Sequence, residues 1–274
     1  MVKHIILDTD IGFDPDDLVT LLLLLNCEQI FIDLIVTNQD FRGVRAHLVK
    51  EVLNMAHKSN IPVVRGAESK QWFFVMEEEY DETIGTDYIE QITDNIDKNE
   101  HTYYLCIGAL TNFAHVLQNA SPLETIHLVQ MGGSEHRREH NFSLDLSAAK
   151  YVFSQDIHCS LIPSELTNNP QIMMSYPESP LLALIEKSAK PEFQLLFSNI
   201  LNFGSPFFLH DPLASMAIIR EDMFRFEPVK VLFSEDNNIN TYQKSDKSKM
   251  RVAVEADYDL FLQFVEDTLG KAVL

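Results

Sequence analysis

Short apolar runs alternate along this chain with amphipathic stretches in which apolar positions recur every three or four residues. Uninterrupted short runs are typical of buried strands, and the three-to-four spacing is typical of helices with one buried side. The predicted strands are residues 4–7, 31–37, 61–64, 101–107, 125–131, 157–162, 229–233 and 250–254. The predicted helices are residues 15–27, 44–57, 88–97, a stretch ending near 119, 145–155 and 258–269. This alternation predicts an α/β fold with an open, mostly parallel central sheet and helices on both faces.

Length and composition favour a single domain over residues 1–274. Of the 274 residues 46% are hydrophobic, which is enough for the large core of an α/β domain of this size. Residues 66–84 are irregular and acidic and are predicted to form a loop or flap, and residues 178–203 are predicted to form helices of a lid or outer layer. No window of about 18 apolar residues predicts a transmembrane span, and Asp8 interrupts the first apolar run, unlike in a signal peptide.

The net charge bears on which partners the protein can bind, and the cysteines bear on its cellular location. The formal net charge is −20, from 21 basic and 41 acidic residues. Such a surface repels phosphate backbones and anionic membranes, so we expect neither nucleic acid polymers nor membranes as partners. Cys27, Cys106 and Cys159 are widely spaced and lack metal-site spacing, which predicts a reducing, cytoplasmic location.

The opening of the chain concentrates acidic residues between the first predicted strand and the first predicted helix. Its five carboxylates are Asp8, Asp10, Asp14, Asp16 and Asp17. Asp14 is predicted to be the N-cap, with Pro15 at the first helical position, but capping uses only one or two acids. Carboxylates aimed at one point repel each other unless a cation or shared protons neutralise them. Hard divalent cations such as Ca²⁺ or Mg²⁺ prefer such oxygen-only surroundings.

Other polar residues follow predicted strands and should reach the same place. In an open parallel sheet, sites form at the carboxyl ends of the strands. The segments expected at this edge are 8–17, 37–40, 108–112, 131–133 and 164–167. His210 and Asp211, which precede a proline and an apolar helix, could join them. The remaining histidines, such as His136 and His140, have no ligand spacing and are expected at the surface.

Five short motifs in this order resemble those of the inosine-uridine preferring nucleoside hydrolase family. They are Asp8–Gly12 with Asp16 and Asp17, Gly108–Asn112, Met131–Gly133, Glu139–Asn141 and His210–Ala214. Each motif alone is weak, but five in the right order are specific. The similarity runs from residue 3 to the last predicted helix.

The resemblance implies Ca²⁺-dependent hydrolysis of the N-glycosidic bond of ribonucleosides, which releases the free base and ribose. The metal ligands it implies are Asp10, Asp17 and Asp211 through their carboxylates and Thr111 through its backbone carbonyl. The ribose-binding residues it implies are Asp16, Asn38, Glu139 and Asn141. Asp10 would also deprotonate the attacking water, and His210 would lie beside the leaving base. A homodimer or homotetramer with a role in nucleoside salvage is implied as well.

The chain departs from the family in three places. The spacer Asp14-Pro15 lengthens the acidic segment, so the choice of metal ligands among Asp14, Asp16 and Asp17 stays open. The loop between Met131 and Glu139 is short and lacks the Gly-Asn that commonly precedes the Glu-x-Asn motif. The usual flap motif after residue 66 is absent. These departures leave open whether the base, or the substrate itself, differs from an ordinary nucleoside.

Two other functions fit parts of the same pattern. A phosphohydrolase of the haloacid dehalogenase type also begins with a strand and Asp-x-Asp, which would make Asp8 the nucleophile and Asp10 the acid, with Mg²⁺. Gly12, however, stands where that motif has Thr or Val. The other alternative is a metal-dependent riboside-binding protein without turnover.

Overall fold

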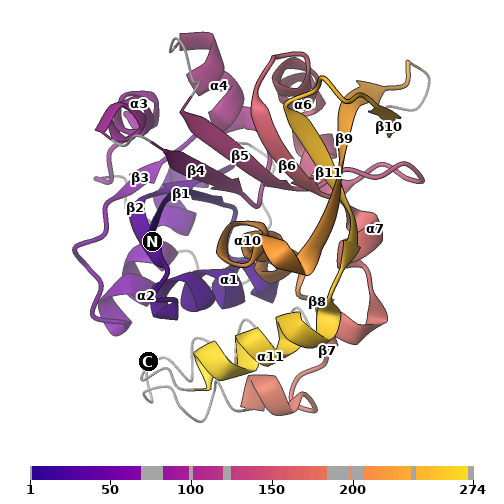
Figure 1. The fold of residues 1–274 in the computed structure, drawn as a ribbon. Coiled ribbons are helices and arrows are strands. Elements are labelled where there is room, and N and C mark those ends of the chain that lie inside the picture. Colours follow the sequence, from indigo (N-terminus) through magenta and orange to yellow (C-terminus); the bar gives the residue numbers. More distant parts are fainter. Residues whose placement is uncertain are drawn as a thin grey trace.

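The computed structural model of the chain describes residues 2–68, 83–98, 101–119, 125–183, 198, 206–235 and 239–270. Its strands form a nine-stranded sheet in the order β10-β9-β11-β6-β5-β4-β1-β2-β3 (Figure 1). The parallel strands are β1 (Lys3–Thr9), β2 (Ile30–Thr37), β3 (Val63–Arg65), β4 (Thr102–Cys106), β5 (Ile126–Met131), β6 (His158–Ile162) and β11 (Met250–Ala256). β9 (Phe224–Phe233) and β10 (Asn240–Lys244) extend the sheet in antiparallel pairing. A two-stranded sheet joins β7 (Met173–Met174) and β8 (Phe207–Phe208).

Helices cover both faces of the large sheet (Figure 1). One layer contains α1 (Pro15–Asn26), α2 (Val44–Met55), α10 (His210–Ile219) and α11 (Tyr258–Leu269), and the other α3 (Tyr88–Lys98), α4 (Thr111–Asn119) and α6 (Leu146–Phe153). The short helices α5 (His140–Leu144) and α7 (Ser164–Thr167) follow β5 and β6. The described residues contain no helix that is long and apolar enough to cross a membrane.

Alternate residues of each central strand pack into opposite cores. In β1, Ile5 and Leu7 belong to the core under α1 and α10, whereas Ile6 belongs to the core under α4. Because both faces are buried, the strand is apolar at consecutive positions rather than at every second one. The apolar runs in the sequence are therefore a direct consequence of the two helical layers.

The predicted fold class is confirmed, and most predicted elements begin and end within a few residues of the observed ones. Several short elements were not predicted: the helices α5 and α7, the paired strands β7 and β8, and β10, which has mostly exposed polar residues and lies at the edge of the sheet. The predicted flap at 66–84 and lid at 178–203 lie largely outside the described residues. The single domain over residues 1–274 stays a prediction.

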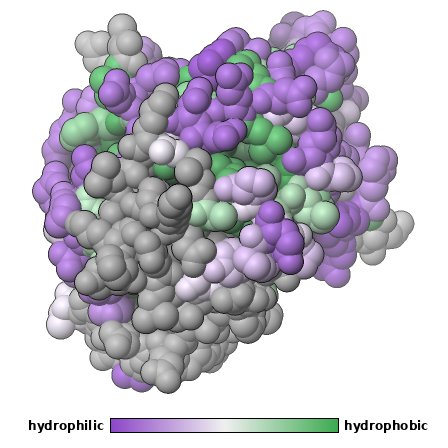
Figure 2. All heavy atoms as spheres, turned by 90° about the horizontal axis from the view of Figure 1, so that it is seen from below, coloured by the Kyte–Doolittle hydropathy of each residue, from purple (hydrophilic) through white to green (hydrophobic). Residues whose placement is uncertain are grey.

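Most of the described surface seen from below is hydrophilic, with smaller apolar areas between the polar ones (Figure 2). This agrees with a chain whose formal charge is −20.

The registers of the parallel strands bring their carboxyl ends to one edge of the sheet. Asp8 in β1 lies opposite Val36 in β2 and Cys106 in β4. Met131 at the end of β5 lies opposite Ile162 at the end of β6. The segments that leave these strands therefore start side by side.

Candidate active site

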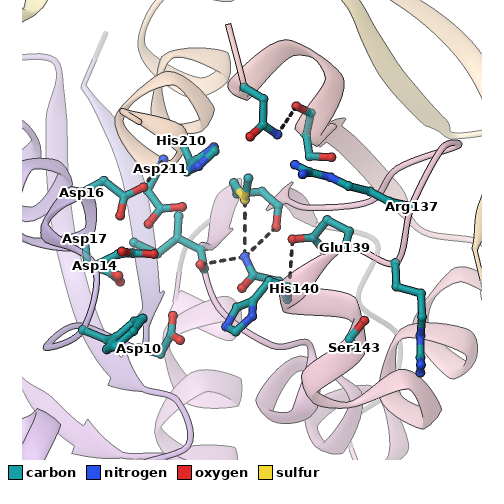
Figure 3. Close-up of a pocket in the computed structure, with 17 residues that line it drawn as sticks. Asp10, Asp14, Asp16, Asp17, Arg137, Glu139, His140, Ser143, His210 and Asp211 are labelled. Atoms are coloured by element: carbon teal, nitrogen blue, oxygen red, sulfur yellow. Dashed lines mark hydrogen bonds between the residues drawn. The ribbon is translucent and has the colours of Figure 1, made fainter. Parts of the chain in front are cut away.

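A cavity of about 410 Å³ opens at this edge of the sheet. Residues from the turn after β1, the ends of β4 and β5, and the starts of α5, α7 and α10 line it. Figure 3 shows two facing walls, one with Asp10, Asp14, Asp16, Asp17 and Asp211 and the other with Arg137, Glu139, His140 and Ser143. The first is called here the acid wall and the second the loop wall.

The acid wall begins in the turn between β1 and α1. Gly12 has φ of 117°, a value that favours glycine, and Pro15 occupies the first turn of α1 as predicted. Asp14 stands at the N-cap position with extended backbone, but its side chain accepts no capping hydrogen bond and lines the cavity instead. Asp14 is therefore the N-cap residue, as predicted, but its carboxylate forms no capping hydrogen bond.

Asp16, Asp17 and Asp211 form an acid triad, with one carboxylate oxygen of each within 4.8 Å of the others. All three are buried, which raises their pKa values, and the neighbouring carboxylates raise them further; that of Asp16 reaches about 8. Few groups compensate this charge: the Thr9 hydroxyl donates to Asp17 at 2.5 Å, and the backbone N–H of Asp211 donates to Asp16 at 3.2 Å. The donor set consists of hard oxygens, which fits a divalent cation.

Asp10 lines the same cavity and raises the pKa values of the three triad carboxyls through its charge. It is not itself a member of the triad. Gly108 allows its close approach to β4, because a Cβ atom at Gly108 would lie 2.8 Å from Asp10 Oδ1. The structure thus places the predicted carboxylates Asp10, Asp16, Asp17 and Asp211 on one wall.

The structure does not bring Thr111 or Asn38 to the cavity lining. Thr111 begins α4, and its hydroxyl donates to Asp145 at 2.9 Å. Ile107 lines the cavity, and its carbonyl accepts a hydrogen bond of 3.0 Å from Asn141. The position of Thr111 therefore does not support its predicted role as a carbonyl ligand, because β4 ends at Cys106 and it is Ile107, directly after the strand, that lines the cavity.

Asn38 is fully buried next to Gly108. Its amide nitrogen donates to Asp8 and to the carbonyl of Ala109, while its Oδ1 has no partner among the described residues. The predicted contact of Asn38 with ribose is not supported by this position, since neither amide atom lies in the cavity lining.

Glu139 and Asn141 line the loop wall, as predicted. Glu139 is the N-cap of α5, and its carboxylate accepts three backbone hydrogen bonds, from Gly133 at 3.1 Å and from Asn141 and Phe142 at 3.0 Å each. Burial nevertheless raises its pKa. The Asn141 amide nitrogen donates to the carbonyls of Ile107 and Met131, which fixes the side chain between β4 and β5.

His210 lies at the start of α10 and lines the cavity. Its Nδ1 is 2.8 Å from the Thr167 hydroxyl, and its ring packs against Phe208 with 5.4 Å between centroids. Burial, and then the charge of Arg137, lowers its pKa to about 4. The imidazole is therefore neutral near pH 7.

Asp8 stands behind the cavity rather than in it. Its carboxylate accepts hydrogen bonds from Tyr104 at 2.6 Å, Asn112 at 3.0 Å and Asn38 at 3.2 Å. Burial raises its pKa to about 7. A fully buried carboxylate with three donors cannot attack a phosphate, which argues against the phosphohydrolase alternative.

Three residues in or behind the cavity were not among the predicted site residues. Arg137 and His140 line the cavity; His140 is exposed, as predicted, but was not predicted to lie at the site. Their nearness to Glu139 in the sequence was the available signal. Arg45 is buried behind the acidic turn, where it donates to the Ile11 carbonyl at 2.8 Å. No sequence motif marks it, because its partner is a backbone atom from a distant segment.

The fold and the cavity together define the class as an α/β protein with a buried cluster of carboxylates at the carboxyl edge of its sheet, which could hold a metal ion. The family model described as inosine-uridine preferring nucleoside hydrolase matches residues 5–263. The chain belongs to this family and is therefore an enzyme of the nucleoside hydrolase class. No curated protein matches the sequence.

Solved structures with this fold are similar over nearly the whole chain. A plant nucleoside hydrolase, PpNRh1, has a TM-score of 0.83 at 16% identity, covering 99% of this chain and 100% of its own. A purine-preferring ribonucleoside hydrolase from Gardnerella vaginalis has a TM-score of 0.82 at 19% identity, covering 98% of both chains. An inosine-uridine preferring nucleoside hydrolase from Bacillus anthracis has a TM-score of 0.75 at 18% identity, covering 99% of this chain and 100% of its own.

Proposed function

We propose that this enzyme hydrolyses the N-glycosidic bond of a ribonucleoside in a Ca²⁺-dependent reaction that releases free base and ribose. The observation that carries the proposal is the acid triad with Asp10 beside it in one cavity. Family membership supports the same bond and the same class of substrate.

A cation fits the acid wall because the described residues offer it carboxylate oxygens with little other compensation. Asp17 and Asp211 would hold it with Asp10 or Asp16, and Ca²⁺ accepts six to eight oxygen ligands, which leaves room for water and substrate hydroxyls. A bound divalent cation would lower the pKa of a water molecule and orient the vicinal ribose hydroxyls. Selectivity for ribosides over 2′-deoxyribosides follows from this second role.

The chain's own residues supply the remaining steps. Asp10 accepts the proton of the attacking water, since it is a carboxylate in the cavity outside the triad. The acid wall stabilises the positive charge that develops on the ribose when the C–N bond breaks. His210 lies beside the leaving base in this proposal; in the tautomer in which the Thr167 hydroxyl donates to Nδ1, the neutral ring keeps its hydrogen on Nε2 and donates a hydrogen bond to the base.

Residues of both walls bind the sugar in this proposal. Asp16 and Glu139 accept hydrogen bonds from ribose hydroxyls, and Asn141 offers its amide oxygen because its nitrogen is already used. Thr111 and Asn38 belong to the ligand and sugar-binding sets only if the site rearranges around a bound substrate.

The test is hydrolysis of purine, pyrimidine and nicotinamide ribosides, followed by the release of reducing sugar, before and after removal of divalent cations with a chelator. We expect turnover of at least one riboside, its loss with the chelator, and recovery on adding Ca²⁺. The matching 2′-deoxyriboside should be cleaved much more slowly. Equal rates with and without chelator would contradict the role of the acid wall, and an absence of turnover with every riboside would contradict hydrolysis.

We also infer a cytoplasmic homodimer or homotetramer that acts in nucleoside salvage. Support comes from the resemblance of the chain to its family and from its three free, buried cysteines. Sedimentation of the purified protein measures the subunit number directly.

A further inference from the structure

The loop wall carries an anchored segment, residues 134–138, that the family motifs do not explain. Ser134 holds its start: the backbone N–H donates to Asn240 at 2.7 Å, and the hydroxyl donates to Glu165 at 2.5 Å. The Glu135 N–H donates to the same Glu165 oxygen at 2.9 Å. The Arg137 N–H donates back to the Ser134 hydroxyl at 3.3 Å. This loop is thus fixed to α7 and β10 before any ligand binds.

Arg137 reaches from this loop into the cavity. Figure 3 shows its side chain running across the loop wall, with the guanidinium directed between Glu139 and His210. Arg138, the next residue, also lines the cavity. A cationic side chain therefore reaches into a cavity whose other wall has five carboxylates.

The described residues give the Arg137 guanidinium no anion. Among the described residues it forms neither a hydrogen bond nor an ion pair. Two acids beside this loop already have partners, since Glu139 accepts three backbone N–H groups and Glu165 accepts from Ser134 and Glu135. A planar guanidinium binds phosphate or carboxylate oxygens in pairs, which makes an oxyanion its natural partner.

We propose that Arg137 binds an oxyanion carried by the riboside, so that the preferred substrate of this site is an anionic riboside rather than a neutral one. The oxyanion is either a phosphate at the ribose 5′ position or a carboxylate on the base. The inference rests on the proposed function for the identity of the sugar, but the pairing of Arg137 with an anion does not depend on turnover.

Binding of the sugar alone is the first test. The probes are ribose 5-phosphate and ribose, titrated calorimetrically into the Ca²⁺-loaded protein and into Arg137→Gln. We expect ribose 5-phosphate to bind the wild type more tightly than ribose, and Arg137→Gln to lose roughly 10- to 100-fold of that affinity, the size of charge-assisted hydrogen bonds. Arg225→Gln is the matched control, because Arg225 is an exposed arginine paired with Glu227 and Glu255 on the sheet edge.

Hydrolysis distinguishes the two sources of the oxyanion. Uridine is compared with its 5′-monophosphate and with a uridine whose base carries a carboxylate, each in wild type and Arg137→Gln. We expect one of the two anionic ribosides to have a higher kcat/KM than uridine, through a lower KM, and to lose that advantage over uridine in Arg137→Gln.

The outcomes separate this inference from the proposed function. Cleavage of uridine with no advantage for any anionic riboside, and no effect of Arg137→Gln on either binding or turnover, overturns the inference and leaves the function standing. Arg137-dependent binding of ribose 5-phosphate without turnover of any riboside supports the inference and contradicts the function. Equal binding of ribose and ribose 5-phosphate, together with equal kcat/KM for uridine and for the uridine whose base carries a carboxylate, contradicts the inference.

Discussion

The two walls of the cavity contain buried carboxylates that differ in their hydrogen bonds. On the loop wall, Glu139 is buried, but three backbone N–H groups satisfy its oxygens. On the acid wall, Asp211 is equally buried, yet its carboxylate accepts no hydrogen bond from the described residues and faces Asp16 and Asp17. The first carboxylate is stable as the protein folds, whereas the second requires a cation or a proton.

This difference shows that burial of an acid does not by itself mark a ligand site. The number of donors that already surround the carboxylate separates a structural acid from one that is available for a ligand.

Asp10→Asn should lower kcat/KM by several orders of magnitude, because it removes the proposed base and a carboxylate of the acid wall. The substitution preserves shape, so the folded structure should persist. Riboside hydrolysis together with circular dichroism measures both. A variant that stays folded and keeps the wild-type rate would refute the role of Asp10.

Asp211→Asn should abolish the gain in Tm that Ca²⁺ gives the wild type, with a loss of turnover of about 10²-fold or more. In the metal-free protein it should instead increase the free energy of unfolding, by about 1–3 kcal/mol, because it removes one of three crowded buried carboxyls, which without a cation must either stay charged without a partner or take up a proton. Thermal unfolding of the variant and the wild type measures both changes, the lost Tm gain with Ca²⁺ and the increased stability with chelator. A metal-free variant less stable than the metal-free wild type would contradict the account of the acid wall.

Gly108→Ala should lower kcat/KM by roughly 10- to 100-fold, since displacement of a reacting group by about 1 Å has an effect of this size. The added Cβ would lie 2.8 Å from Asp10 Oδ1 and push the carboxylate away. Gly85→Ala is the control: its Cβ would lie 2.7 Å from an Asp87 oxygen, outside the cavity. Equal kinetics of the two variants would show that the position of Asp10 is not set by Gly108.

Glu139→Gln should destabilise the protein by about 1–2 kcal/mol both with and without Ca²⁺. In the wild type three backbone N–H groups donate to the Glu139 carboxylate, whereas in the variant the NH₂ group of the glutamine would face one of these donors and could not accept its hydrogen bond. The effect on turnover should be severalfold. Its sign in the metal-free protein is opposite to that of Asp211→Asn, which makes the pair the most direct test of the comparison. Chemical unfolding of both variants measures it.

His127 provides a reference far from both walls. Burial, and then the charge of Arg251, lowers its pKa from 6.5 to about 4. Below pH 6.5 the unfolded chain takes up a proton that the folded chain refuses, so the free energy of unfolding falls as the pH drops from 6.5 to about 4. His127→Gln should reduce this pH dependence by about 1–3 kcal/mol over that range, and leave turnover unchanged. Unfolding with urea at several pH values, for variant and wild type, measures the difference.

The sequence by itself determined the sheet, the two helical layers and most of the acid wall. Strands buried on both faces are apolar at consecutive positions, and helices keep a period of 3.6, so both patterns are local. Asp10, Asp16, Asp17 and Asp211 were recognisable because they follow a strand or begin a helix, and such positions meet at the carboxyl edge.

Only the tertiary structure decided which polar groups are free to act. The Asp14 carboxylate lines the cavity and forms no capping hydrogen bond, and the side chains of Asn38 and Thr111 bond to other protein groups. Ile107, rather than Thr111, lines the cavity. Arg137 lines the cavity because Glu165 and Asn240, distant in sequence, hold its loop. Hydrogen bonds between segments far apart in the chain produce no periodic pattern in the sequence. The sequence therefore predicts where acidic side chains gather, but not which of them already accept hydrogen bonds from the protein.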